Sequence, residues 1–109
     1  MSDQQLRSCI QACFACAEEC GRCAAACLQE PNASEMARCV RLDVDCAEIC
    51  QVAASFMARS SELSGVICQA CAAVCEACAE ECAKHSAQHC QQCAQACRAC
   101  AAECRKMAA

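Results

Sequence analysis

Cysteines recur along this chain at alternating intervals of three and four residues. The first run is Cys9, Cys13, Cys16, Cys20, Cys23 and Cys27, and the later runs are Cys68, Cys71, Cys75, Cys78 and Cys82, then Cys90, Cys93, Cys97, Cys100 and Cys104. These intervals place the side chains on one face of an α-helix. Alanine, the strongest helix former, separates many of them. The pattern predicts helices whose narrow buried face consists of thiols.

An internal repeat extends this pattern to four helices. Residues 13–20 read CFACAEEC, residues 75–82 CEACAEEC and residues 97–104 CRACAAEC, while DVDCAEIC at 43–50 shares the second half. Eleven residues before the start of each repeat stands a side chain that favours a helix N-cap, namely Ser2, Asn32, Ser64 and Ser86. Gln5 and Glu35 follow Ser2 and Asn32 at the spacing of a capping box. The sequence therefore predicts helices near 3–28, 33–59, 64–85 and 87–107.

The connections between these helices are short, which makes neighbouring helices antiparallel. We predict an all-α fold, an antiparallel up-down four-helix bundle with a cysteine-lined lumen, formed by residues 1–109 as one domain. Equivalent repeat positions, such as Cys13, Asp43, Cys75 and Cys97, are expected to share a layer of the lumen. The charged side chains outside the seam are expected to face solvent: Glu18, Arg22, Glu76, Glu80, Lys84, Arg98 and Arg105.

The composition removes several classes of protein. Of 109 residues, 19 are cysteine and 26 alanine, whereas Leu, Ile, Val and Phe together number 14. That is too little apolar surface for an ordinary hydrocarbon core. No apolar stretch is long enough to span a membrane, and the net charge of −4 without a basic stripe argues against nucleic-acid binding. The polar N-terminus shows no secretory signal, so we expect a cytoplasmic protein with reduced thiols.

Metal binding explains the thiols better than packing or disulfides do. Alanine or valine would fill the same space without the risk of oxidation, and cysteines one turn apart on a helix are poorly placed for disulfides. Thiolates select Cu(I), zinc or iron–sulfur clusters. Zinc requires separate tetrahedral sites, and zinc tetrathiolates would bury double negative charges. Cu(I) accepts two or three sulfurs, and one ion per thiolate keeps the lumen near neutral. A zinc or general thiol-metal buffer, similar to a helical metallothionein, is the alternative.

Catalysis is not expected. The sequence has no Ser-His-Asp set and no glycine-rich phosphate loop, and a buried ladder singles out no exposed, low-pKa cysteine of the kind a thiol oxidoreductase uses. We therefore assign no catalytic residue.

The sequence resembles the bacterial copper storage proteins, most closely their cytosolic branch. The resemblance rests on the cysteine ladders, on RLDVDCAEIC at 41–50 and on KHSAQHCQQCAQAC at 84–97. It implies a four-helix bundle assembled as a homotetramer, which stores and detoxifies many Cu(I) ions in each protomer. We also expect a copper chaperone as a partner. It also implies that all 19 cysteines bind metal, Cys39, Cys46 and Cys50 of the second helix included.

The two ends of the expected bundle differ in their chemistry. Soft and borderline donors gather at one end: Cys23, Cys27, Met36, His85, His89 and Cys90. Leu6, Ala53, Met57 and Met107 lie at the other, so we expect copper to enter at the histidine end, where histidines also line the mouth in the cytosolic branch. The alternatives are a helix-dipole role for the histidines and core packing for Met36.

Two features of the second helix allow more than one interpretation. Asp43 interrupts the thiol seam, either to hydrogen-bond a neighbouring helix or cap the thiolate cluster, or because the helix is rotated and the carboxylate is solvated. Apolar residues of this helix are expected to pack on another helix or on a second subunit: Leu42, Ile49, Val52 and Phe56. Ile10 and Phe14 also fit a contact between subunits.

Overall fold

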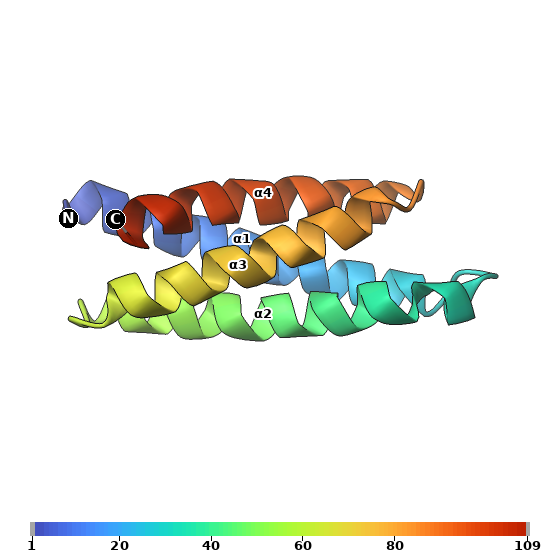
Figure 1. Cartoon of the computed structure of the whole chain (residues 1–109), viewed down its shortest axis with the longest axis horizontal. Coiled ribbons are helices and arrows are strands. Elements are labelled where there is room, and N and C mark those ends of the chain that lie inside the picture. The colour runs from blue at the N-terminus through green and yellow to red at the C-terminus, as the bar shows by residue number, and fades with distance from the viewer. Residues whose placement is uncertain (1, 109) are drawn as a thin grey trace.

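A computed structural model describes residues 2–108, and these form the predicted antiparallel four-helix bundle. The helices are α1 (Asp3–Cys27), α2 (Ala37–Ala58), α3 (Ser64–Ala83) and α4 (Gln88–Ala108), and a 3₁₀ turn, η1 (Ala33–Met36), precedes α2. They run alternately up and down along a rod of 45 × 17 × 17 Å (Figure 1). The described ends of the chain lie at one end of the rod, together with the α2–α3 connection.

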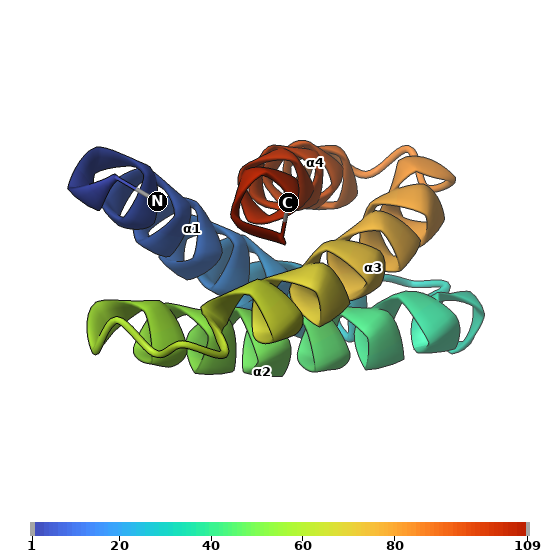
Figure 2. The same ribbon diagram turned by 60° about the vertical axis from the view of Figure 1, so that its left-hand side comes forward.

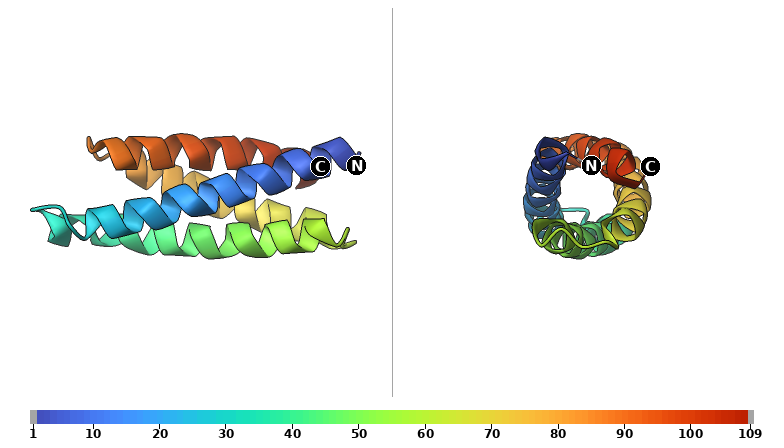
Figure 3. Two further views of the ribbon diagram at one scale, coloured as in Figure 1. Left: turned by 180° about the vertical axis from the view of Figure 1, so that it is seen from behind. Right: turned by 90° about the vertical axis from the view of Figure 1, so that its left-hand side faces the viewer.

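The four helices form a ring around a common axis. Each helix packs along two neighbours, so that α1 and α3 each contact both α2 and α4. The end-on view in Figure 3 shows the square arrangement, and the oblique view in Figure 2 shows α4 on the side opposite α2. The α1–α2 and α3–α4 connections therefore lie together at one end of the ring, where the sequence predicts the histidines.

The centre of this ring is filled by the thiols. All of the cysteines have zero solvent exposure, and the other buried apolar side chains within residues 2–108 are small alanines and three methionines. The charged residues expected outside the seam are not buried. The three-four spacing therefore predicted both the helices and the faces that they bury.

The N-cap predictions are only partly confirmed. Ser2 caps α1 as predicted, with its Oγ accepting from the Gln5 backbone N at 3.1 Å and the Gln5 Oε1 accepting from the Ser2 backbone N at 3.0 Å. Asn32 makes no such cap. It precedes a 3₁₀ turn instead of an α-helix, and its side chain donates to Glu35 Oε2 at 3.2 Å. The tight turn after Pro31 thus replaces the capping box.

The other two predicted caps are wrong. Ser64 is the first residue of α3 itself, and its Oγ donates to the Ser61 carbonyl at 2.8 Å. Ser61 orders this connection instead, because its Oγ accepts from the Leu63 backbone N at 3.0 Å. Ser86 lies two residues before α4, which begins at Gln88. The positions at which these helices start depend on the geometry of the short connections. The sequence repeat does not encode that geometry.

The predicted layers of the lumen also need correction. Most residues at equivalent repeat positions do not lie side by side, because neighbouring helices run in opposite directions. Cys16 and Cys46, 3.6 Å apart between Sγ atoms, are an exception. Cys13 lies 3.7 Å from Cys100 and 3.9 Å from Cys104, measured between Sγ atoms. Cys97, its repeat equivalent, instead lies 3.6 Å from Cys16 and 3.7 Å from Cys20.

Candidate metal centre

The lumen is lined by closely spaced sulfur atoms. Cysteines one turn apart on a helix approach each other, as Cys46 and Cys50 do at 4.0 Å between Sγ atoms. Cysteines on adjacent helices also approach each other, with 3.6 Å for Cys46 and Cys75 and 3.5 Å for Cys39 and Cys82. None of the thiols is in a disulfide. Contacts therefore link the sulfurs both along each helix and around the ring.

Three groups of four sulfurs within metal-binding distance share members instead of standing apart. In each group the Sγ atoms lie within 4.8 Å of one another. Cys16 and Cys46 belong both to the group with Cys50 and Cys75 and to the group with Cys20 and Cys97. A set of separate tetrahedral sites would need four sulfurs of its own for each ion. Shared sulfurs suit ions with fewer ligands that bridge neighbouring thiolates.

Burial favours protonated thiols in the lumen. It raises the pKa of the Cys90 thiol to about 11. The pKa of Cys27 is also raised, first by burial and then by the neighbouring Cys39 and Cys90. Such thiols are S–H groups at neutral pH, and each metal ion that binds them must displace protons. These two thiols can thus be buried without counter-charges before metal arrives.

Asp43 points into this network and is fully buried, so the solvated alternative is wrong. Its Oδ1 accepts hydrogen bonds from the thiols of Cys78 and Cys93, each at 3.3 Å, and from Cys82 at 3.4 Å. Its Oδ2 accepts from Cys39 at 3.9 Å. The carboxyl group thereby joins α2 to α3 and α4. This is the hydrogen bond to a neighbouring helix that the sequence offered as one role for Asp43.

The same burial makes Asp43 a weak acid. Desolvation, followed by the charge that Cys93 would carry, raises its pKa from 3.8 to about 8. Between these two values the folded protein holds a proton that the unfolded chain has released. The metal-free bundle should therefore lose stability as pH rises through this window.

Replacing Asp43 by asparagine tests this expectation. The amide of asparagine cannot ionise, so the D43N variant should show a flatter stability profile than the wild type, which should lose on the order of a few kcal/mol between about pH 5 and pH 8. Denaturant unfolding of both metal-free proteins under reducing conditions measures the difference. Parallel pH profiles would show that Asp43 does not titrate in this way.

His89 lies where the thiol network meets the mouth of the bundle. Its Nδ1 is 3.5 Å from Cys23 Sγ and 3.6 Å from Cys90 Sγ, and its Nε2 is 2.8 Å from Glu30 Oε1. The ring is partly exposed and borders a hollow of about 500 Å³ at this end of the bundle. The structure thus brings His89 together with two of the cysteines expected beside it.

His85 and Met36 line the same hollow in different ways. Met36 is buried, as expected for packing, yet it lies at the mouth. The Nε2 of His85 is 2.8 Å from Glu81 Oε2, and no thiol of the described residues is within hydrogen-bonding distance of this ring. Among the described residues, His85 therefore contacts the Glu81 carboxylate and none of the thiols.

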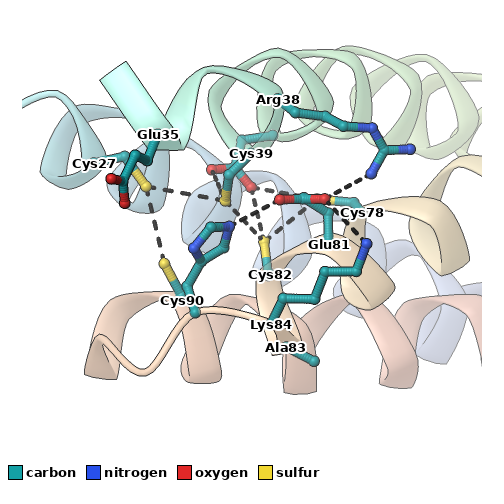
Figure 4. Close-up of polar contacts among 12 residues, drawn as sticks. Cys27, Glu35, Arg38, Cys39, Cys78, Glu81, Cys82, Ala83, Lys84 and Cys90 are labelled. Carbon is teal, nitrogen blue, oxygen red and sulfur yellow. Dashed lines mark hydrogen bonds and ion pairs between the residues drawn. The ribbon is translucent and has the colours of Figure 1, made fainter. Parts of the chain in front are cut away.

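Sequence reasoning missed Glu81, whose carboxylate is an ion-pair centre at the mouth. It is nearly buried and lies 2.6 Å from Arg38 Nη1 and 3.6 Å from Lys84 Nζ, in addition to its contact with His85 (Figure 4). Burial raises the pKa of Glu81, but the hydrogen bonds from His85 and Arg38 outweigh burial and lower it. The spacing of four residues between Glu81 and His85, within the helix expected at 64–85, was the available signal.

The opposite end of the lumen is closed by apolar side chains. Met57 and Met107 are buried there, and Leu6 packs against the core. The Cys68 thiol points at the Met57 sulfur, with 3.6 Å between Sγ and Sδ. The structure therefore has one polar mouth with metal-binding donors and one apolar end, as the sequence predicted.

Within residues 2–108, no helix combines the length and apolarity needed to cross a bilayer.

The chain is similar to several known proteins. The family model described as copper storage protein matches residues 2–109. A cysteine-rich protein of Bacillus subtilis (strain 168), YhjQ, is 45% identical over 87 residues, which cover 80% of this chain and 81% of that protein. The Cu(I)-bound copper storage protein BsCsp3 superposes with a TM-score of 0.92 at 45% identity, covering 96% of this chain and 99% of that chain.

A second solved structure is that of a cytosolic copper storage protein from Streptomyces lividans loaded with five coppers. It has a TM-score of 0.93 at 39% identity and covers 96% of this chain and 92% of that chain. Fold and sequence agree over nearly the whole chain. The chain therefore belongs to the copper storage protein family.

Proposed function

We propose that this protein stores copper by binding many Cu(I) ions per chain through the thiolates of its 19 cysteines. The observation that carries this proposal is the series of contacts between buried thiols along the lumen, which Asp43 completes between Cys93 and Cys82. Similar proteins have been solved with Cu(I) bound and with five coppers bound. Storage in the cytoplasm limits the free concentration of a toxic ion while keeping it available.

Stoichiometry tests the proposal against a zinc buffer. The lumen stays nearly neutral when it holds about one Cu(I) per thiolate. The copper capacity should therefore be on the order of 15–20 ions per chain. Anaerobic titration of the metal-free protein with Cu(I) in the presence of a chromophoric chelator, followed by thiol counting, measures it. Saturation at four or five ions, with Zn(II) bound in preference to Cu(I), would contradict copper storage.

A storage role without catalysis fits the placement of the thiols. Every cysteine is fully buried, so none offers the exposed, reactive thiolate that disulfide exchange or peroxide reduction requires. We assign Asp43 a structural role in the metal-free lumen, in which it accepts hydrogen bonds that copper would later replace. The Met36 side chain forms part of the wall of the hollow at the histidine end.

The assembly that we propose is a homotetramer of single-domain chains. Apolar side chains on α2 and α3 support a contact between subunits, since Val44, Val52 and Val66 are all exposed. Phe14, at 56% exposure on α1, adds a further apolar surface. We propose that a copper chaperone delivers the ions to the assembled protein.

Copper is proposed to enter at the histidine end. Imidazole binds Cu(I) less tightly than a thiolate does, so His85 and His89 can accept an ion and release it inward. The double variant H85A/H89A should load copper about 10–100-fold more slowly, while capacity falls by only one or two ions, because the inner thiols are intact. Stopped-flow transfer of Cu(I) from a defined donor measures the rate.

A matched control is Gln88→Ala, which removes an exposed side chain from the same hollow. This variant should load at the wild-type rate. If the double variant also loads at the wild-type rate to the wild-type endpoint, the histidines are helix-end residues only and copper enters elsewhere.

A further inference from the structure

We infer that Glu30 is a positioning residue that presents the Nδ1 atom of His89 to copper at the mouth of the lumen. This inference rests on the proposed storage function. The observation behind it is the geometry of the His89 ring, which has a carboxylate on one nitrogen and two thiols on the other.

The position of Glu30 is defined by the chain around it. It lies in the α1–α2 connection, where its backbone N donates to the Cys27 carbonyl at 3.2 Å and its carbonyl accepts from the Ala33 backbone N at 3.1 Å. His89 lies in the first turn of α4. Their contact, at 2.8 Å, therefore ties the α1–α2 connection to the start of α4 across the mouth.

The contact determines which nitrogen of the ring can bind metal. A neutral imidazole has one N–H donor and one acceptor nitrogen, and a carboxylate only accepts. The proton therefore lies on Nε2, facing Glu30 Oε1. The lone pair of Nδ1 then faces Cys23 and Cys90. This is the arrangement in which a carboxylate orients a metal-binding histidine and fixes its tautomer.

The three donor atoms already have the spacing of a metal site. The edges of the triangle are 3.5 Å from Nδ1 to Cys23 Sγ, 3.6 Å from Nδ1 to Cys90 Sγ and 3.8 Å between the two sulfurs. A three-coordinate ion with metal–nitrogen and metal–sulfur bonds of about 2.0–2.3 Å requires edges of about 3.5–4.0 Å. The tautomer of His89 and the distances between the three donor atoms therefore already suit a three-coordinate ion.

Glu30 differs in this respect from Glu81, the other carboxylate that holds a histidine. Glu81 also pairs with Arg38 and Lys84, and its histidine contacts no thiol within the described residues. The carboxylate of Glu30 pairs with His89 alone among the described side chains. Loss of Glu30 should therefore affect this ring specifically.

The first test reads the tautomer in the metal-free protein. Long-range ¹H–¹⁵N correlation spectra of ¹⁵N-histidine protein distinguish Nε2–H from Nδ1–H. The wild type should show the Nε2–H tautomer of His89, and Glu30→Ala should show a mixture. Glu30→Gln should keep the wild-type tautomer, because its amide oxygen can still accept from Nε2. An unchanged tautomer in Glu30→Ala would overturn the inference.

The second test reads copper uptake in the same proteins. Glu30→Ala should slow the first phase of Cu(I) transfer by about 10-fold, while Glu30→Gln stays near the wild-type rate and total capacity stays within one ion of wild type. Glu35→Ala is the matched control: it removes the same charge from the same end, but Glu35 contacts Asn32 and not His89. An unchanged rate in Glu30→Ala, or an equal slowing in Glu35→Ala, would overturn the positioning role.

Failure of the storage function would give a different result. In that case the wild type itself would fail to load, whereas the tautomer measurement would still report on Glu30. Circular dichroism of each variant checks that the bundle is intact.

Discussion

Loading with Cu(I) should raise the unfolding temperature of this protein by tens of degrees. An ion that binds only the folded chain stabilises it by about 2.7 kcal/mol when its free concentration is a hundredfold above the dissociation constant. Several ions contribute in sum, and 1 kcal/mol corresponds to roughly 4–8 °C in a domain of this size. The effect is large because the metal-free core contains so little hydrocarbon.

Far-UV circular dichroism under anaerobic conditions measures this effect. The metal-free protein should already be helical, since alanine-rich helices and the buried seam favour the bundle without metal. Its melting temperature should then rise with each addition of Cu(I) until the lumen is full. A random-coil spectrum without metal, or equal melting temperatures with and without copper, would contradict this account.

Replacing all 19 cysteines by serine should abolish copper storage. A hydroxyl is a hard, weakly acidic ligand with little affinity for Cu(I). The variant should bind one or two ions at most, through its histidines, when copper is counted by atomic absorption after gel filtration. Retention of more than half of the wild-type copper would place the binding sites outside the lumen.

A second variant guards against a failure of the all-serine chain to fold. Serine at the five cysteines of α4, which are Cys90, Cys93, Cys97, Cys100 and Cys104, leaves the other three walls of the lumen intact. It should lose at least five ions, and more if bridging ions also leave. The loss follows because α4 sulfurs contact sulfurs of both α1 and α2, as Cys97 does with Cys16 and Cys46.

Much of the fold was predictable because cysteine spacing encodes which face of each helix is buried. The period and the repeat predicted four helices, and the short connections predicted their antiparallel order. The helix starts at Asn32 and Ser64 were less predictable, since a 3₁₀ turn and the Ser61 side chain decide them. Layering failed for a different reason: repeat equivalence ignores the reversal of chain direction between neighbours.

The site was predictable wherever its residues share the periodic pattern. Asp43 stands on the seam, so its inward orientation follows from spacing, although its three shortest contacts come from α3 and α4. The pairing of Glu30 with His89 had no such signal. The two residues are 59 positions apart, and only the meeting of two connections at the mouth brings them together.

The most direct test of the central claim is the location of copper itself. Anomalous scattering recorded at the copper edge, from crystals of protein loaded with Cu(I), gives the position and ligands of every ion. We expect a row of ions along the whole lumen, from Cys9 and Cys104 at the apolar end to Cys23 and Cys90 at the mouth, each held by two or three donor atoms. A few isolated ions with four sulfur ligands each, or copper on the surface beside an empty lumen, would contradict the account.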